Sequence, residues 1–347
     1  MNGLNDNWIE KVWYGSSLIY WVLLPFTLLF AVVVALRRYL YSQKILRSNS
    51  VDVPVIVVGN ITAGGTGKTP VTIWLARALA KSGRSPGIIS RGYRGKVGPR
   101  PLQAKADSKP AVVGDEAILL ASQCDCPVVV HPDRTAAAKM AIELGADIVI
   151  SDDGLQHYRL RRDFEIAVVD GNRGFGNGNL LPAGPLREPI ARMKSVDRIL
   201  IHRHSDDERE IFRRSYDTPP LSFRLQVTGV SRLDNSEQRK IEEFAGTTVH
   251  AVAGIGHPER FFLMLEAHGI DVKRHPLPDH ADITPDDIVF DDDLEILMTE
   301  KDAVKCQWMD TSNCWYVPVE VDFEGADADM LLDQVLAVRK DRERRKR

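Results

Sequence analysis

The sequence predicts an α/β protein with a doubly wound parallel sheet, a second, smaller α/β domain and an N-terminal hydrophobic membrane helix. Three observations lead to this prediction. Residues 53–60, VPVIVVGN, form a continuous β-branched run that is typical of a strand buried on both faces of a parallel sheet. A glycine-rich stretch and an apolar-periodic helix at 69–83 follow it, and short apolar runs then alternate with helical segments. Between Val12 and Leu36 the chain carries no charged residue.

The uncharged N-terminal segment is long enough to reach across a bilayer. Residues 18–36 read LIYWVLLPFTLLFAVVVAL, and as a helix they span about 28 Å, close to the ~30 Å hydrocarbon core. Aromatic residues precede the segment and Arg37 and Arg38 follow it, so we expect residues 1–48 to anchor the chain at the cytoplasmic face of a membrane. A shallow insertion kinked at Pro25 and a buried soluble helix are the alternatives to a full span.

Composition indicates a globular protein without a nucleic-acid partner. The 347 residues carry a formal net charge of -3, whereas binding to a polyanion normally leaves a basic surface. Four cysteines at irregular spacing predict free thiols in a reducing compartment rather than disulfides or a zinc site.

We expect residues 49–225 to form the core domain and residues 226–347 a smaller α/β domain that ends in a basic tail. Further core strands are predicted at 86–90, 127–131, 146–152, 165–170 and 196–202, with helices near 115–122 and 134–144. The smaller domain is predicted to have strands at 249–256, 295–299 and 315–323, with helices at 258–269 and from about 326. Pro219 and Pro220 mark the boundary between the two.

The stretch GNITAGGTGKTP (59–70) resembles a phosphate-binding loop that lacks one glycine. The pattern G-x-x-x-x-G-K-[ST] fits at its end, but Thr62 stands where the first glycine belongs. In such loops backbone N–H groups surround the β-phosphate, the lysine reaches the β and γ oxygens, and the hydroxyl coordinates Mg²⁺. We therefore predict a P-loop NTPase-type site for a nucleotide. Its predicted residues are Thr62, Ala63, Gly64, Gly65, Thr66, Gly67, Lys68 and Thr69.

The missing glycine has a conformational consequence. Thr62 carries a Cβ and needs a negative φ, so we expect the sharpest bends at Gly64 and Gly65. The related ATPases that place division machinery or load metals carry an early loop lysine that reaches a partner's nucleotide, and Ala63 stands at that position here. A membrane-tethered ATPase of that kind is one alternative function, and a non-catalytic nucleotide-dependent scaffold is another.

Two adjacent aspartates end the predicted strand in IVISDDGLQH. Carboxylates at the carboxyl end of a parallel strand beside the loop are placed to hold Mg²⁺. Because adjacent residues of a strand point to opposite faces, we expect Asp152 and Asp153 to have different roles. A turn or a helix N-cap is the structural alternative for the pair.

Further motifs make a resemblance to one family specific. They are SRGYRG (90–95), GDEAILLA (114–121), HPDR (131–134), SDDGLQHYRLRRD (151–163), LLPAGPLREP (180–189), GIGHPERFF (255–262), PDH (278–280) and TEKDAVK (299–305). Together with the loop, they make the chain similar over nearly its whole length to tetraacyldisaccharide 4'-kinase, the lipid A 4'-kinase of Gram-negative envelope synthesis. That family tolerates Thr62 in its loop. It often has Phe where Leu155 stands and Asn where His257 stands, and neither position touches the phosphate chemistry.

The resemblance implies transfer of the ATP γ-phosphate to the 4'-hydroxyl of a tetraacylated disaccharide 1-phosphate, with Mg²⁺, at the cytoplasmic face of the inner membrane. It also implies roles for single residues. Lys68 and Thr69 serve the triphosphate and Mg²⁺, and Asp153 is the metal ligand with Asp152 nearby. Arg187 and Glu188 lie at the nucleotide or the transferring phosphate. Asp115 is the candidate base, tuned by His280.

Several of these residues also have a structural interpretation. Asp115 opens a predicted helix and can be its N-cap, His280 can be a surface loop histidine, and Arg187 can form a plain ion pair.

Two further motifs carry hypotheses about contacts with the substrates. Arg91, Tyr93 and Arg94 follow a strand end at the rim expected for the loop, and we hypothesise that they grip the lipid's 1-phosphate or sugar. Lys301 and Asp302 resemble the base-reading N-K-x-D of GTP-binding proteins and are candidates for adenine or ribose contacts.

Overall fold

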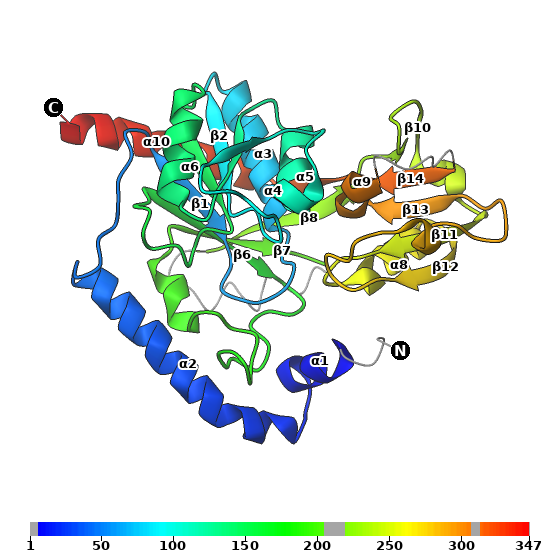
Figure 1. The fold of residues 1–347 in the computed structure, drawn as a ribbon, viewed down its shortest axis with the longest axis horizontal. Coiled ribbons are helices and arrows are strands. Elements are labelled where there is room, and N and C mark those ends of the chain that lie inside the picture. Colours follow the sequence, from blue (N-terminus) through cyan, green and yellow to red (C-terminus); the bar gives the residue numbers. More distant parts are fainter. Residues whose placement is uncertain (1–5, 205–218, 307–312, 347) are drawn as a thin grey trace.

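The computed structural model describes residues 6–204, 219–306 and 313–346, arranged as two lobes and an N-terminal helical segment (Figure 1). Side chains are described only up to residue 338, so the basic tail predicted at 339–347 lies outside the described side chains. The predicted doubly wound α/β fold with a smaller α/β lobe is confirmed.

A nine-stranded sheet forms the larger lobe. Its strands are β1 (Val55–Gly59), β2 (Pro86–Ser90), β3 (Leu102–Ala104), β4 (Val128–Val130), β5 (Ile148–Asp152), β6 (Phe164–Asp170), β7 (Arg198–His202), β8 (Leu221–Val227) and β15 (Val319–Phe323). They lie in the order β15-β8-β7-β6-β1-β5-β2-β4-β3. All pairs between β8 and β4 are parallel, whereas β15 and β3 join antiparallel at the two edges.

Helices cover both faces of the larger sheet. They are α3 (Lys68–Lys81), α4 (Pro110–Val113), α5 (Asp115–Gln123), α6 (Arg134–Glu143) and α10 (Asp327–Lys346), with a 3₁₀ turn, η1, at Ile190–Ser195. Ile56 and Val58 of β1 pack in one core cluster with residues of α3, α5 and α10, and Val55 and Val57 pack in a second with α6. The alternation along β1 is that of a strand buried on both faces.

A six-stranded sheet forms the smaller lobe, in the order β10-β9-β14-β13-β11-β12. Its elements are β9 (Val230–Arg232), β10 (Gln238–Arg239), η2 (Ile241–Phe244), β11 (Thr248–Ala253), α8 (Pro258–Ala267), β12 (Asp271–Pro276), η3 (Pro285–Asp287), β13 (Ile296–Thr299), α9 (Glu300–Cys306) and β14 (Cys314–Val317).

The predicted strand at 315–323 is two strands in two different sheets. β14 pairs with β13 in the smaller lobe, whereas β15 pairs with β8 in the larger one. Pro318 separates them, and a proline has no N–H group with which to continue a ladder. The chain therefore returns to the larger lobe at Pro318. β15 and α10, which were expected in the 226–347 domain, are part of the larger lobe.

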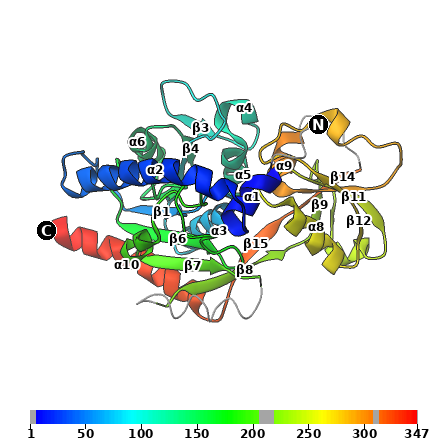
Figure 2. The same cartoon turned by 90° about the horizontal axis from the view of Figure 1, so that it is seen from below.

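Two helices precede the larger lobe: α1 (Asp6–Tyr14) and α2 (Ile19–Ser42), which lies along one side of that lobe (Figure 2). In the described part of the chain, α2 alone is long and apolar enough to cross a membrane. Its one buried side chain is Thr27, whose Oγ1 donates to Leu180 O at 3.3 Å and accepts from Ala183 N at 2.9 Å. The middle of α2 is therefore fastened to the larger lobe.

Candidate active site

The glycine-rich loop joins the carboxyl end of β1 to the N-terminus of α3. Gly64 has a φ of +101° and Gly67 a φ of +90°, conformations that favour glycine. Thr62 does not share this conformation and forms an antiparallel bridge with Leu186. The bend predicted at Gly65 lies instead at Gly67, because there the loop turns into the first turn of α3. The free N–H groups of that turn make an anion site.

A segment after β6 braces the loop from outside. Ala63 N donates to Pro185 O and Arg187 N donates to Ile61 O, both at 2.7 Å. Asn60 braces it from inside, because its Nδ2 lies 3.3 Å from Thr62 Oγ1 and 3.4 Å from Thr66 Oγ1. These hydrogen bonds within the chain therefore stabilise the shape of the loop.

Three charged side chains converge beside the loop. Lys68 Nζ lies 3.8 Å from Asp153 Oδ1, and Arg187 Nη1 donates to Asp153 Oδ2 at 3.1 Å. Burial opposes ionisation of Asp153, but Lys68 and Arg187 outweigh it and hold the pKa of that carboxyl below its ordinary value. Asp153 also has a φ of +45°, which is uncommon for a residue with a Cβ.

The neighbouring Asp152 faces another element. Its Oδ1 accepts a hydrogen bond from Thr72 Oγ1 of α3 at 3.0 Å, and its side chain is almost fully buried. Burial, together with the charges of Glu116 and Asp153, raises the pKa of Asp152 to about 7. The two aspartates thus differ in surroundings, because Asp152 is the last residue of β5 and Asp153 begins the turn that follows it.

The donors beside the loop fit a magnesium ion. Asp153 Oδ1 is buried and has no hydrogen-bond partner, although buried polar atoms are nearly always satisfied. A carboxylate oxygen with free lone pairs next to a phosphate-binding loop is the ligand that Mg²⁺ prefers. Thr69, in the first turn of α3, offers a hydroxyl on the same loop.

Glu188 lies behind the loop. It is 2% exposed, and its carboxylate accepts from Tyr158 Oη and lies 3.6 Å from Arg192 Nε. Gln156 connects it to the loop, because Gln156 Nε2 donates to Asn60 O at 2.8 Å and lies 3.4 Å from Glu188 Oε2. Glu188 therefore supports the loop from behind and does not line it.

The second half of the site forms where the lobes meet. Asp115 opens α5 in the larger lobe, and its Oδ2 lies 2.8 Å from Nδ1 of His280 in the smaller lobe. Asp115 is 7% exposed and His280 has a φ of +57°, so neither is an ordinary surface residue. A Cβ on Gly256 of the smaller lobe would lie 3.5 Å from Gly65 N, so the lobes also meet at the phosphate loop.

Burial alone would raise the pKa of Asp115. The hydrogen bond from His280 and the charges of Lys301 and Lys305 outweigh burial, so that pKa lies below its ordinary value. The carboxylate is ionised at neutral pH and accepts hydrogen bonds.

The SRGYRG residues divide into two groups. The Tyr93 ring lies 5.2 Å from the His280 ring, and Arg94 Nη1 donates to His280 O at 2.6 Å. Arg91 is exposed directly after β2.

The two candidates for contacts with a nucleotide base, Lys301 and Asp302, are both engaged by other groups of the protein. Asp302 is fully buried, and its Oδ2 accepts from Gly254 N at 2.8 Å and from Thr299 Oγ1 at 2.6 Å. It supports the smaller lobe and has no accessible oxygen. Lys301 Nζ contacts His280 Nε2 at 3.1 Å.

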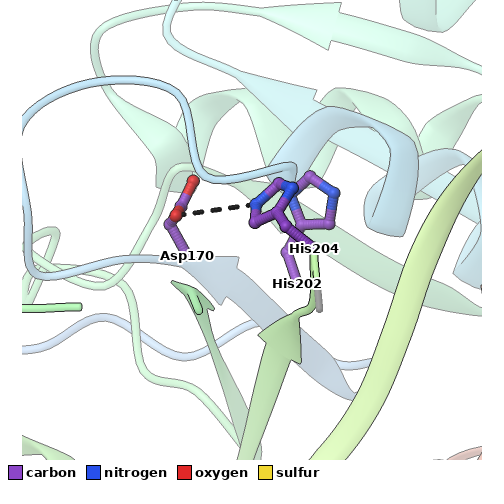
Figure 3. A group of neighbouring side chains, drawn as sticks. All are labelled: Asp170, His202 and His204. Atoms are coloured by element: carbon purple, nitrogen blue, oxygen red, sulfur yellow. Dashed lines mark ion pairs between the residues drawn. The ribbon is translucent and has the colours of Figure 1, made fainter. Parts of the chain in front are cut away.

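A cluster of Asp170, His202 and His204 lies at the ends of β6 and β7 (Figure 3), with candidate ligand atoms within 4.8 Å of one another. Arg260 of α8 pairs with both Asp170 oxygens, and Arg173 N donates to Oδ1 at 2.9 Å. A carboxylate so fully engaged by an arginine does not suit a metal ion. The cluster instead joins the lobes through Arg260.

Within this cluster, His202 is the residue that adjoins the loop. Its ring stacks on Phe223 at 5.1 Å and 11°, and burial lowers its pKa to about 3. A Cβ on Gly67 would lie 3.4 Å from His202 Nδ1.

Comparison with known proteins identifies the family. A family model described as tetraacyldisaccharide-1-P 4'-kinase matches residues 19–337. The chain belongs to this kinase family. A tetraacyldisaccharide 4'-kinase of Nitrosococcus oceani is 42% identical over 330 residues, which cover 94% of each chain. One of Alkalilimnicola ehrlichii is 47% identical over 307 residues, which cover 88% of this chain and 90% of the relative.

A solved structure of this kinase family supports the fold. The "apo" form of LpxK from Aquifex aeolicus, in complex with ATP, aligns with a TM-score of 0.77 and 28% identity, covering 92% of this chain and 99% of that one. The family is membrane-associated, and α2 is the helix of the described chain suited to that association.

Several residues of the site were not predicted from the sequence. Asn60, Gln156 and Arg260 each lie inside a motif that was recognised, but the sequence does not indicate which group an amide or an arginine side chain contacts. The local signal for Asn60 is its place directly after a buried strand, where a short polar side chain can bond to the following turn.

Proposed function

We propose that the chain transfers the γ-phosphate of ATP to the 4'-hydroxyl of tetraacyldisaccharide 1-phosphate in lipid A biosynthesis, at the cytoplasmic face of the inner membrane. One observation is the main support for assigning the active site. A braced phosphate loop and the Asp115–His280 pair lie at the carboxyl edge of the same sheet, where ligands of open α/β sheets bind.

The donor side holds and neutralises the triphosphate. The amides of 64–69 surround the phosphates, Lys68 reaches the β and γ oxygens, and the planar cation of Arg187 spreads charge over the transferring group. Thr69 and Asp153 hold Mg²⁺, with Asp152 behind them. When bound, Mg²⁺ neutralises negative charge on the phosphate oxygens. Lys68 and Arg187 now pair with Asp153, and they exchange part of that contact for phosphate oxygens.

The acceptor side positions a sugar hydroxyl. Asp115 Oδ1 accepts from Glu116 N at 2.9 Å and Oδ2 accepts from His280, so the carboxylate is fixed where the two lobes meet. Asp115 accepts the proton of the 4'-hydroxyl as that oxygen bonds to the γ-phosphorus, the bond from this phosphorus to the β–γ bridging oxygen breaks and ADP leaves. His280 orients Asp115. Tyr93 and Arg94, next to His280, contact the sugar, and Arg91 the 1-phosphate.

The anchoring helix lies in one leaflet and does not span the bilayer. A span would place Thr27 near the bilayer centre, and Leu180 and Ala183 with it, because Thr27 bonds to both. The outer side of α2 presents apolar side chains that are more than half exposed, among them Trp21, Phe26 and Leu29. The segment that α2 contacts follows β6 and leads to Arg187, so the lipid surface adjoins the active site.

The test is a transfer assay. The purified chain is incubated in detergent with ATP labelled at the γ-phosphate, Mg²⁺ and tetraacyldisaccharide 1-phosphate, and the product is examined for label at the 4' position. Lys68→Met should abolish transfer, and Lys139→Met, which removes an exposed lysine on α6, should not. Label absent from the lipid in the wild-type reaction would refute the proposal.

The same assay separates the alternative of a membrane-tethered ATPase. An ATPase releases labelled phosphate without lipid, and its rate does not need Asp115. A kinase loses lipid labelling when Asp115 becomes Asn while its binding of ATP is retained. The lack of an early loop lysine at Ala63 favours the kinase.

A further inference from the structure

Lys301 of α9 lies at the Asp115–His280 pair, with its ammonium close to three acceptors. Its Nζ is 3.1 Å from His280 Nε2, 3.4 Å from Asp279 Oδ1 and 3.5 Å from Glu116 Oε1. Its side chain is 18% exposed. An ammonium has three N–H bonds and no lone pair, so the lysine is the donor in its hydrogen bonds to His280 and Asp279, and its contact with Glu116 is an ion pair.

This geometry determines where His280 carries its proton. Because Lys301 only donates, Nε2 must be the unprotonated ring nitrogen. The proton then resides on Nδ1, from which it is donated to Asp115 Oδ2 at 2.8 Å. The order of donation runs from Lys301 through His280 to Asp115.

We propose that Lys301 is a positioning residue that holds His280 in the neutral Nδ1–H form and thereby makes Asp115 the proton acceptor of the reaction. The proposal rests on the kinase function proposed above. Lys301 acts through His280 and needs no contact with either substrate.

The charges around His280 show why such a residue is needed. Asp115 contacts its Nδ1 from α5, Asp279 lies 3.7 Å from its Nε2, and Glu116 of α5 contacts the adjoining Lys301. Three carboxylates would favour an imidazolium. Lys301, Lys305 of α9 and Arg94 after β2 supply the opposing charge, and Lys301 is the one in contact with a ring nitrogen.

An imidazolium would also change the chemistry of the pair. Its Nε2–H would point at the Lys301 ammonium 3.1 Å away, which costs electrostatic energy in a partly buried site. Without Lys301, Nε2 loses the donor that keeps it unprotonated, and Asp279, 3.7 Å away, favours a proton there. The resulting cation beside Asp115 would make the carboxylate a weaker base.

The first measurement needs no substrate. The full chain in detergent micelles is labelled with ¹⁵N-histidine, and the signals of His280 are assigned by their absence in His280→Gln. The wild type should show the neutral Nδ1–H pattern from pH 6 to 8. Lys301→Met should form an imidazolium within that range, Lys301→Arg should keep the neutral form because a guanidinium also only donates, and Lys139→Met should match the wild type.

The second measurement is kinetic. The kcat/KM of the wild type should vary little from pH 6 to 8, whereas that of Lys301→Met should fall over the pH range in which the ¹⁵N signals show the imidazolium. At pH 6 the Lys301→Met change should cost about tenfold or more alone and less than about twofold in a His280→Gln background, because both act through one ring. Thermal unfolding of each variant verifies that it is folded.

The possible results distinguish failure of this proposal from failure of the proposed kinase function. An Nε2–H tautomer in the wild type, or an unchanged His280 state in Lys301→Met, overturns the proposal, as does a loss in Lys301→Met that is the same with and without His280. If the tautomers follow the prediction but no variant labels the lipid, the kinase function fails and the role of Lys301 in fixing His280 stands.

Discussion

Asp115 and His280 lie 165 residues apart in the sequence and on different lobes, yet 2.8 Å separates Asp115 Oδ2 from His280 Nδ1. The pair exists only while the lobes are together. Because Gly256 also approaches Gly65, the same arrangement brings the smaller lobe onto the phosphate loop. Assembly of the base and approach to the nucleotide are therefore one structural event.

The pH profile should reveal this pair. Asp115 must be ionised, and its pKa is below the ordinary value, so activity should stay level from about pH 8 to pH 5 and fall only in more acidic solution. In His280→Gln the hydrogen bond that lowers the pKa is weakened, so the acid limb should move to higher pH. Asp115→Asn should lower kcat by about 10²- to 10⁴-fold at every pH. An acid limb that stays in place in His280→Gln would contradict the assignment.

Local patterns predicted the elements well because each depends on nearby residues. The strand at 86–90 and the strand that ends at Asp152 were placed from β-branched runs, and both are buried. The return of the chain at Pro318 was not predictable in the same way. Residues 315–323 read as one strand, and only pairing with β8, about a hundred residues earlier, decides which sheet receives the second half. Contacts between residues so far apart in the sequence produce no local sequence pattern.

Substitutions at two loop glycines should separate an effect on stability from an effect on ATP binding. Gly67 has a φ of +90°, and a Cβ there would lie 3.4 Å from His202 and Phe223. Gly67→Ala should therefore lower the free energy of unfolding by about 1–2 kcal/mol. A Cβ on Gly65 would meet nothing within 4 Å, so Gly65→Ala should change stability by less than about 0.5 kcal/mol.

Gly65→Ala should nevertheless raise the KM for ATP, because its Cβ enters the space that the phosphates occupy. Urea unfolding and ATP titrations of the two variants test the pair. Normal ATP affinity in Gly65→Ala would show that the triphosphate lies away from this part of the loop.

Arg260 and Asp170 should stabilise the closed arrangement of the lobes. Asp170 is 2% exposed; burial opposes its ionisation, but hydrogen bonds from His204 and Arg260 outweigh burial and lower its pKa strongly. Arg260→Gln leaves a buried carboxylate short of its partner and should cost about 3 kcal/mol in the free energy of unfolding.

The sign of the pH effect follows from that lowered pKa. A carboxyl whose pKa is depressed on folding contributes stability above its unfolded pKa and loses it as pH falls, here from about pH 5 downward. The wild type should therefore lose more stability between pH 7 and pH 3 than Arg260→Gln does. Equal losses measured by urea unfolding would mean that the pair contributes nothing.

The chemistry of the site was predictable where one residue type serves one purpose. The strand-loop-helix pattern predicts that the loop lysine and the adjacent aspartates lie together, and Lys68 Nζ lies 3.8 Å from Asp153 Oδ1. Lys301 shows the limit. The resemblance of TEKDAVK to a base-reading motif suggests adenine or ribose contacts, whereas the contact that the fold adds, by bringing α9 against α5, is one between Lys301 and an imidazole. The sequence does not predict which acceptor a lysine contacts, because an ammonium can donate to any acceptor within reach.

The outer side of α2 allows a test of membrane docking that spares the fold. Phe26 and Leu29 are 60% and 65% exposed, so Phe26→Glu with Leu29→Glu removes little packing while it places two charges where lipid is expected. Each charge opposes insertion by a few kcal/mol, so binding to vesicles and transfer to bilayer-embedded substrate should fall at least tenfold. Transfer to detergent-dispersed substrate should stay within about twofold, because the site itself is unchanged. The matched control is Lys81→Glu with Lys139→Glu, two exposed lysines of α3 and α6. If the α2 variant loses activity equally in detergent and in vesicles, α2 serves the fold and the lipid reaches the site without it.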